Sequence, residues 1–195
     1  MSIKIHFYLF LFMAYMFMIG KIEIFLIFYF SVLIHEMAHI VIALILNVDV
    51  DELWLMPVGV CAVYKENIMP IKEVIISLAG PIMSLILAMF SKDNFISNVN
   101  IIIMILNLIP IYPLDGGRLQ KNFFVYKFGY GKGIKISQFV SDFFIVILFA
   151  VSIVFAIHFK NFNMLFVTSY VLFLSREEVK KERILRIINY LQTDE

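Results

Sequence analysis

Hydrophobic residues occur along this chain in six long runs, and the stretches between the runs hold most of the charged residues. Several runs are shorter than the ~20 residues that a straight helix needs to cross ~30 Å of hydrocarbon. Local thinning of the bilayer or burial within a bundle accommodates such short spans. The pattern therefore predicts an all-α polytopic membrane protein with six transmembrane helices, at about 5–20, 24–46, 74–90, 99–114, 138–157 and 161–175.

The pattern changes between the second and third runs. Short apolar stretches surround Pro57 and Gly59, an arrangement typical of two brief strands joined by a turn. The fold prediction therefore includes a short β-hairpin between helices two and three. Because this segment is too apolar for a free loop, we expect it to enter the membrane interface or to cover a site. A simple surface hairpin is the alternative.

Composition agrees with a membrane protein, since 62% of the residues are hydrophobic, well above the usual share in soluble domains. The expected surroundings are therefore a lipid bilayer. A net charge of +1 gives no electrostatic reason to expect nucleic acid as a partner. The single cysteine, Cys61, excludes a disulfide within the chain.

The positive charges predict the orientation of the six spans. Of the 16 lysines and arginines, 13 fall on the side shared by both termini, and the other side holds only Lys21, Lys92 and Lys160. Lysine and arginine are enriched in cytoplasmic loops. Both termini are therefore expected in the cytoplasm of a multi-pass protein of the cell membrane.

One domain and a short tail follow from this pattern. Residues 1–175 are expected to form the six-span domain. Residues 176–195 space hydrophobic positions among charges, which predicts an amphipathic cytoplasmic helix. Within the six-span domain, the 115–137 segment carries the glycine-rich run 129–133 and is expected to be a flexible basic linker at the membrane surface.

His35, Glu36 and His39 lie within the unbroken apolar run from Ile24 to Leu46. Polar groups kept at this depth usually mark a functional site. Two histidines four residues apart on a helix point the same way, so both can reach one metal ion. Glu36 lies beside them, where a general base is needed. The alternative is that these three side chains only hydrogen-bond one another between helices.

A catalytic zinc site usually takes three protein ligands, and Asp115 is the best candidate for the third. By the ~1.5 Å rise per helical residue, Asp115 would lie somewhat closer to the cytoplasm than His39. Pro110 and Pro113 can break the helix there and let the following backbone turn inward. We therefore expect one Zn²⁺ per chain.

These motifs resemble those of the site-2 proteases, a family of intramembrane zinc metalloproteases, and are most similar to its stage IV sporulation protein FB branch. The resemblance rests on the run from His35 to His39, on Ala79-Gly80-Pro81, and on the run from Asn107 to Gly116. It implies His35, His39 and Asp115 as zinc ligands and Glu36 as the general base. It also implies that Asn107 helps to bind the substrate strand. One departure is Ser84, where family members commonly carry asparagine.

The resemblance further implies cleavage of a membrane-embedded or membrane-associated protein by zinc-activated water. In the sporulation branch the substrate is a sigma-factor precursor, inhibitory membrane proteins restrain the protease, and the site of action is the mother-cell membrane around the forespore. A membrane zinc transporter or metal-binding protein that uses the same buried ligands is the alternative. Runs one, five and six offer few polar groups at depth for a transport path, which favours the protease.

Overall fold

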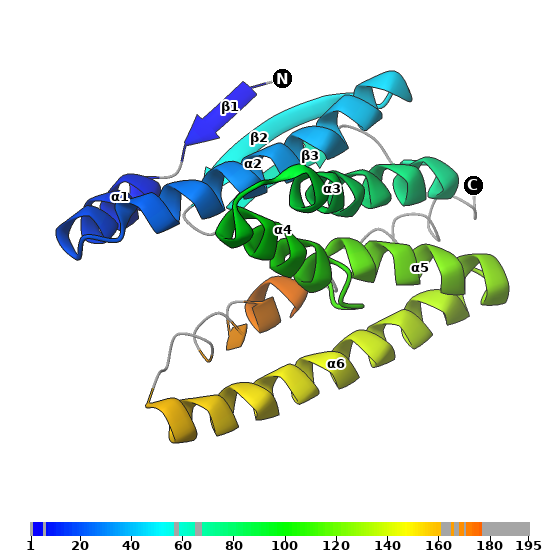
Figure 1. Ribbon diagram of the computed structural model, residues 1–195. Helices are drawn as coiled ribbons and strands as arrows, with labels where there is room; N and C mark the ends of the chain where they lie inside the picture. Colours follow the sequence, from blue (N-terminus) through cyan, green and yellow to red (C-terminus); the bar gives the residue numbers. More distant parts are fainter. Residues whose placement is uncertain are drawn as a thin grey trace. The chain divides into compact units, whose positions relative to one another are not determined.

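The computed structural model describes residues 2–5, 7–56, 59–64, 68–160, 165, 168–169 and 171–176. The chain divides into two compact units, Met1–Leu108 and Ile109–Glu195, and each is mainly helical (Figure 1). The boundary at residue 175 between a six-span domain and a tail stays a prediction, because residues 177–195 lie outside the described residues.

The first unit contains three strands and four helices among its described residues. In chain order they are β1 (Ser2–Ile5), α1 (Phe7–Met18), α2 (Ile22–Ile45), β2 (Val50–Met56), β3 (Gly59–Tyr64), α3 (Pro70–Phe90) and α4 (Asn94–Asn107). Helix α2 packs against α3, and α3 packs against α4. Figure 1 shows β2 and β3 alongside the later half of α2.

The three strands form one sheet in the order β1-β2-β3. Strand β1 pairs parallel to β2, and an ion pair between Lys4 and Glu52 joins them. Strands β2 and β3 pair antiparallel, with Met56 opposite Gly59, in the region where the sequence predicts a hairpin. Residues 57 and 58, between these strands, lie outside the described residues. Strand β1 was not anticipated, because four residues give too short a pattern.

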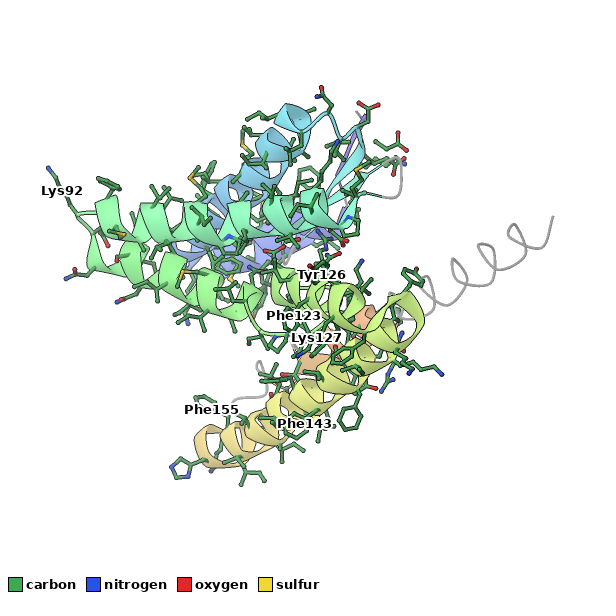
Figure 2. All side chains as sticks on the ribbon, turned by 90° about the vertical axis from the view of Figure 1, so that its right-hand side faces the viewer. Lys92, Phe123, Tyr126, Lys127, Phe143 and Phe155 are labelled. Carbon is green, nitrogen blue, oxygen red and sulfur yellow. The ribbon has the colours of Figure 1, made fainter. Side chains whose placement is uncertain are left out.

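The second unit contains α5 (Asp115–Phe128) and α6 (Tyr130–Phe159), followed by further helical residues up to Arg176. Helices α5 and α6 approach closely at Gly133, where an added Cβ would lie 2.5 Å from Val125 Cα. On α5, Phe123 and Tyr126 are exposed, and Lys127 Nζ lies 6.0 Å from the centroid of the Phe123 ring (Figure 2). Exposed aromatic and basic side chains are typical of a membrane interface.

Three of the described helices are long and apolar enough to span a membrane: Ile22–Ile45, Pro70–Phe90 and Tyr130–His158. They contain most of the second, third and fifth hydrophobic runs, so the prediction of a membrane protein is supported. The apolar segments Leu9–Met18 and Asn94–Asn107 are shorter. The count of six spans stays a prediction, since most of the sixth run lies outside the described residues.

Two predicted segments were wrong. The fourth run was expected to be helical to Leu114, but α4 ends at Asn107. The residue before a proline disfavours the helical conformation, so Pro110 does not allow the helix to continue. The expected flexible linker at 115–137 is helical, because α5 fills its first part and α6 begins at Tyr130. Gly129, with φ of 76°, separates the two helices.

A small hydrophobic core fixes α2 against α3. Its buried residues are Ile40, Ala43, Val50 and Ile76. Lys72 Nζ also donates a hydrogen bond of 2.8 Å to the Leu46 carbonyl, which lies just after the last residue of α2. These contacts set the position of α3 beside the histidines of α2.

Candidate metal centre

His35 and His39 lie one turn apart on α2, and both side chains are buried, with exposed fractions of 1% and 2%. Their ring centroids are 4.9 Å apart, and the ring planes are inclined by 77°. The two imidazoles therefore share one buried face of the helix, as the i, i+4 spacing predicted.

Each histidine has its Nδ1 atom engaged by α3. His39 Nδ1 lies 2.7 Å from the Ile76 carbonyl oxygen. A carbonyl can only accept, so His39 Nδ1 carries the hydrogen and the neutral ring has its lone pair on Nε2. His35 Nδ1 lies 2.8 Å from the Ser84 hydroxyl oxygen. This arrangement is typical of metal-binding histidines, which donate the hydrogen of the second ring nitrogen to a nearby oxygen.

Gly80 on α3 lies directly beside both Nε2 atoms. A Cβ added to Gly80 would lie 2.2 Å from His39 Nε2 and 2.5 Å from His35 Nε2. Both distances are far below van der Waals contact, so no larger residue fits without a shift. The absence of a side chain at Gly80 thus keeps space next to these two nitrogen atoms.

The polar face of α2 extends one further turn toward its amino end. Ser31 is buried and lies four residues before His35. Its hydroxyl oxygen accepts a hydrogen bond of 3.2 Å from Asn100 Nδ2 on α4. Ser31, His35 and His39 therefore form a buried polar stripe along α2, and each residue of the stripe meets a polar atom of α3 or α4.

Glu36 and Asn107 are half-buried in the same unit. Glu36 follows His35 directly on α2. Asn107 is the last residue of α4, and its Nδ2 donates a hydrogen bond of 3.0 Å to the Ile103 carbonyl. One of its amide hydrogens is thus used within the helix. The roles expected for these two residues stay predictions.

Asp115 belongs to the second unit, where it is buried as the first residue of α5. The preceding segment folds back on the helix, since a Cβ added to Gly117 would lie 2.6 Å from the Ile111 carbonyl carbon and oxygen. Tyr112 N donates a hydrogen bond of 3.1 Å to Ser141 Oγ on α6, and the Tyr112-Pro113 peptide bond is cis. These contacts fix the backbone on which Asp115 is carried.

Sequence patterns alone missed some of these polar partners. Ser31 was detectable, because it repeats the four-residue spacing of the histidines. The Ile76 carbonyl was not detectable, since a backbone acceptor leaves no signal in the sequence.

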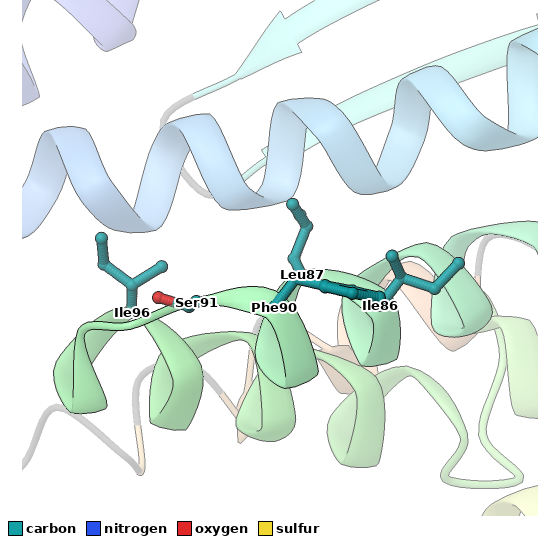
Figure 3. Close-up of a pocket in the computed structure, with 5 residues that line it drawn as sticks. All are labelled: Ile86, Leu87, Phe90, Ser91 and Ile96. Atoms are coloured by element: carbon teal, nitrogen blue, oxygen red, sulfur yellow. The ribbon is translucent and has the colours of Figure 1, made fainter.

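An apolar pocket of about 360 Å³ near the end of α3 is lined by Ile86, Leu87, Phe90, Ser91 and Ile96 (Figure 3). It has no titratable lining residue and is not part of the metal centre.

Residues 23–92 match the model of Peptidase family M50. This stretch carries the His-Glu-x-x-His motif of α2 and Gly80 of α3. This part of the chain is therefore similar to the M50 peptidases. A zinc metalloprotease from Methanocaldococcus jannaschii is 31% identical over 129 residues, which cover 58% of this chain and 38% of that protein.

Two further comparisons agree with this family. Stage IV sporulation protein FB from Bacillus subtilis is 29% identical over 133 residues, covering 61% of this chain and 46% of the relative. The solved structure of a site-2 protease from Methanocaldococcus jannaschii is similar with a TM-score of 0.67 and 25% identity, covering 90% of this chain and 89% of that one. The chain spans less than half the length of the two curated relatives.

Proposed function

We propose that this chain is an intramembrane zinc metalloprotease of the M50 family. The observation that carries the proposal is the pair of buried imidazoles on α2, His35 and His39, with both Nε2 atoms beside Gly80. Buried ionisable groups in an apolar helix are costly and are retained mainly where they serve a function. The names of the M50 relatives support the assignment, since one is a zinc metalloprotease and another a site-2 protease.

We propose His35, His39 and Asp115 as the ligands of one zinc ion per chain. The histidines fit this role because their Nδ1 atoms are engaged and Gly80 leaves room beside Nε2. Asp115 offers a buried carboxylate, and two histidines with one carboxylate form a known catalytic zinc set. Its place in the set is supported by the Pro-Leu-Asp-Gly run and by its fixed position at the start of α5.

Glu36 is the general base of the proposed reaction. Zinc, when bound, supplies a Lewis acid that activates water and polarises the peptide carbonyl. Glu36 accepts the proton of the attacking water and then delivers it to the leaving amine. Its position directly after His35 on α2 supports this role. Asn107 is proposed to bind the substrate strand, and its position at the end of α4 leaves its amide oxygen available.

The proposed substrate is a membrane-embedded or membrane-associated protein, with a sigma-factor precursor cleaved during sporulation as the specific candidate. Similarity to a stage IV sporulation protein supports this part of the proposal. Inhibitory membrane proteins are the proposed partners.

The proposed location is the cell membrane, with six spans and both termini in the cytoplasm. In a spore former, the proposed location is the mother-cell membrane around the forespore. The distribution of lysine and arginine supports this orientation.

Comparison of Glu36→Gln with Glu23→Gln tests the proposal. Both residues lie on α2, but Glu23 is exposed in its first turn. Each variant is co-expressed with a candidate sigma-factor precursor tagged at both ends, and zinc is measured in the purified protein. We expect Glu36→Gln to keep its zinc and to cut nothing, while Glu23→Gln cuts like the wild type.

Cleavage by Glu36→Gln at the wild-type rate would reject the role of Glu36. Wild-type protein that cuts a single-span membrane polypeptide but not the precursor would reject the sigma-factor substrate and leave the protease assignment standing. Wild-type protein that cuts neither would reject the assignment.

A further inference from the structure

We propose that Ser84 is a positioning residue of the metal centre, whose hydroxyl oxygen holds His35 with its Nε2 atom toward the metal. The proposal rests on the zinc site proposed above. Ser84 Oγ lies 2.8 Å from His35 Nδ1, and both side chains are almost completely buried, at 0% and 1% exposed. Because both groups are shielded from bulk solvent, water does not readily replace a hydrogen bond lost at this position.

The two histidines are held in different ways. The backbone carbonyl of Ile76 holds His39, so no substitution of a side chain removes that acceptor. A side-chain hydroxyl holds His35. Of the two Nδ1 contacts, the one to His35 is therefore the one that a side-chain substitution can remove.

The direction of the Ser84 hydrogen bond decides what His35 can bind. A serine hydroxyl can accept from Nδ1–H or donate to a bare Nδ1. When it donates, the hydrogen of the neutral ring sits on Nε2 and blocks metal binding there. When it accepts, Nε2 keeps its lone pair. The proposed role requires the accepting arrangement, which matches the arrangement that the Ile76 carbonyl imposes on His39.

Gly80 and Ser84 act from the same face of α3. They are four residues apart, which is about one helical turn, and both lie beside the imidazole ring of His35. Gly80 leaves room beside Nε2, and Ser84 fixes the opposite ring nitrogen. One turn of α3 thus provides both the space for the metal and the orientation of its ligand.

Ser77 provides a matched control on the same helix. Like Ser84 it has an exposed fraction of 0%, and it lies seven residues earlier on α3. Its hydroxyl has no hydrogen-bond partner among the described residues. Ser77→Ala and Ser84→Ala therefore remove the same atom from equally buried positions, and only the second removes a hydrogen bond to a histidine.

The test measures metal binding by full-length protein purified in detergent. The zinc dissociation constant is obtained by competition with a chelator, and Co²⁺ replaces Zn²⁺ for visible absorption spectroscopy. We expect Ser84→Ala to weaken zinc binding by about 10–100-fold, the usual effect of losing a group that orients a metal ligand. We also expect its Co²⁺ spectrum to change. Ser77→Ala is expected to match the wild type in both measurements.

Equal zinc affinity and an unchanged Co²⁺ spectrum for Ser84→Ala would overturn the role of Ser84 and leave the zinc site intact. Equal losses in both variants would also overturn it, because the effect would then come from helix packing. Wild-type protein that binds no zinc would overturn the proposed function together with this inference.

Discussion

Gly80 on α3 and His39 on α2 are so close that a Cβ on Gly80 would lie 2.2 Å from His39 Nε2. The same Cβ would lie 2.5 Å from His35 Nε2. One glycine therefore borders the two nitrogen atoms proposed to bind zinc. The role of Gly80 here is to leave space. Because Gly80 lies inside a helix, the wider backbone freedom of glycine is not needed at this position.

Gly80→Ala is expected to weaken zinc binding about tenfold or more. The added methyl must displace an imidazole, and forcing extra volume into a packed site typically costs about 1–3 kcal/mol. Each ~1.4 kcal/mol lost from binding is a tenfold change in affinity. Chelator competition on the purified variant measures the change.

Gly131→Ala is the control for Gly80→Ala. Gly131 also lies inside a helix, but a Cβ there meets nothing within 4 Å. This variant is expected to bind zinc normally. If Gly80→Ala also binds zinc normally, the space beside Nε2 is not where the metal sits.

Asp115→Asn is expected to lower zinc affinity at least about tenfold, because an amide is a much weaker ligand than a carboxylate and leaves the ion's charge uncompensated. Asp142→Asn is the matched control, since Asp142 is partly exposed on α6 and pairs with Arg176 at 3.4 Å. Zinc content after dialysis against a chelator measures both variants. An undiminished content in Asp115→Asn would mean that another residue is the third ligand.

Cysteine labelling in intact cells tests the proposed orientation. In a Cys61→Ala background, Lys92→Cys places a thiol in the turn between α3 and α4 (Figure 2), and Lys132→Cys places one near the start of α6. A membrane-impermeant maleimide is expected to label the cysteine at position 92 and not the one at 132. The reverse pattern, or equal labelling of both, would contradict cytoplasmic termini.

Zinc transport is expected to be absent. A transport path usually needs ligating groups at several depths, whereas among the described residues the buried histidine and acidic side chains are His35, His39 and Asp115. Reconstituted protein with a zinc-sensitive dye inside the liposomes should show no influx above that of empty liposomes. Influx that disappears in the His35→Ala variant would favour the transporter instead.

A strong hydrophobic pattern predicted α2, the helix that carries both His35 and His39. The run 24–46 corresponds to α2 (Ile22–Ile45), and the i, i+4 spacing correctly placed His35 and His39 on one buried face. Both results follow from local properties, namely the length of an apolar run and the period of a helix. The part of the candidate metal centre that lies on α2 was therefore predictable from the sequence.

Polar helices and contacts between helices were not predictable in the same way. Hydropathy does not detect α5, which is rich in polar residues, so the segment after Asp115 was mistaken for a linker. The contact of Ser84 with His35 depends on how α3 is rotated against α2, and no sequence spacing specifies that rotation. Ser84 therefore looked like a departure from its relatives, although its hydroxyl contacts a proposed zinc ligand.

The zinc content of the detergent-purified protein tests the central claim most directly. Elemental analysis measures it in the wild type, in the His35→Ala/His39→Ala double variant and in His158→Ala. His158 is exposed near the end of α6 and serves as the control. The expected result is one zinc per chain in the wild type and in His158→Ala, and none in the double variant at unchanged helix content. Wild-type protein without zinc, or a double variant that keeps it, would contradict the account.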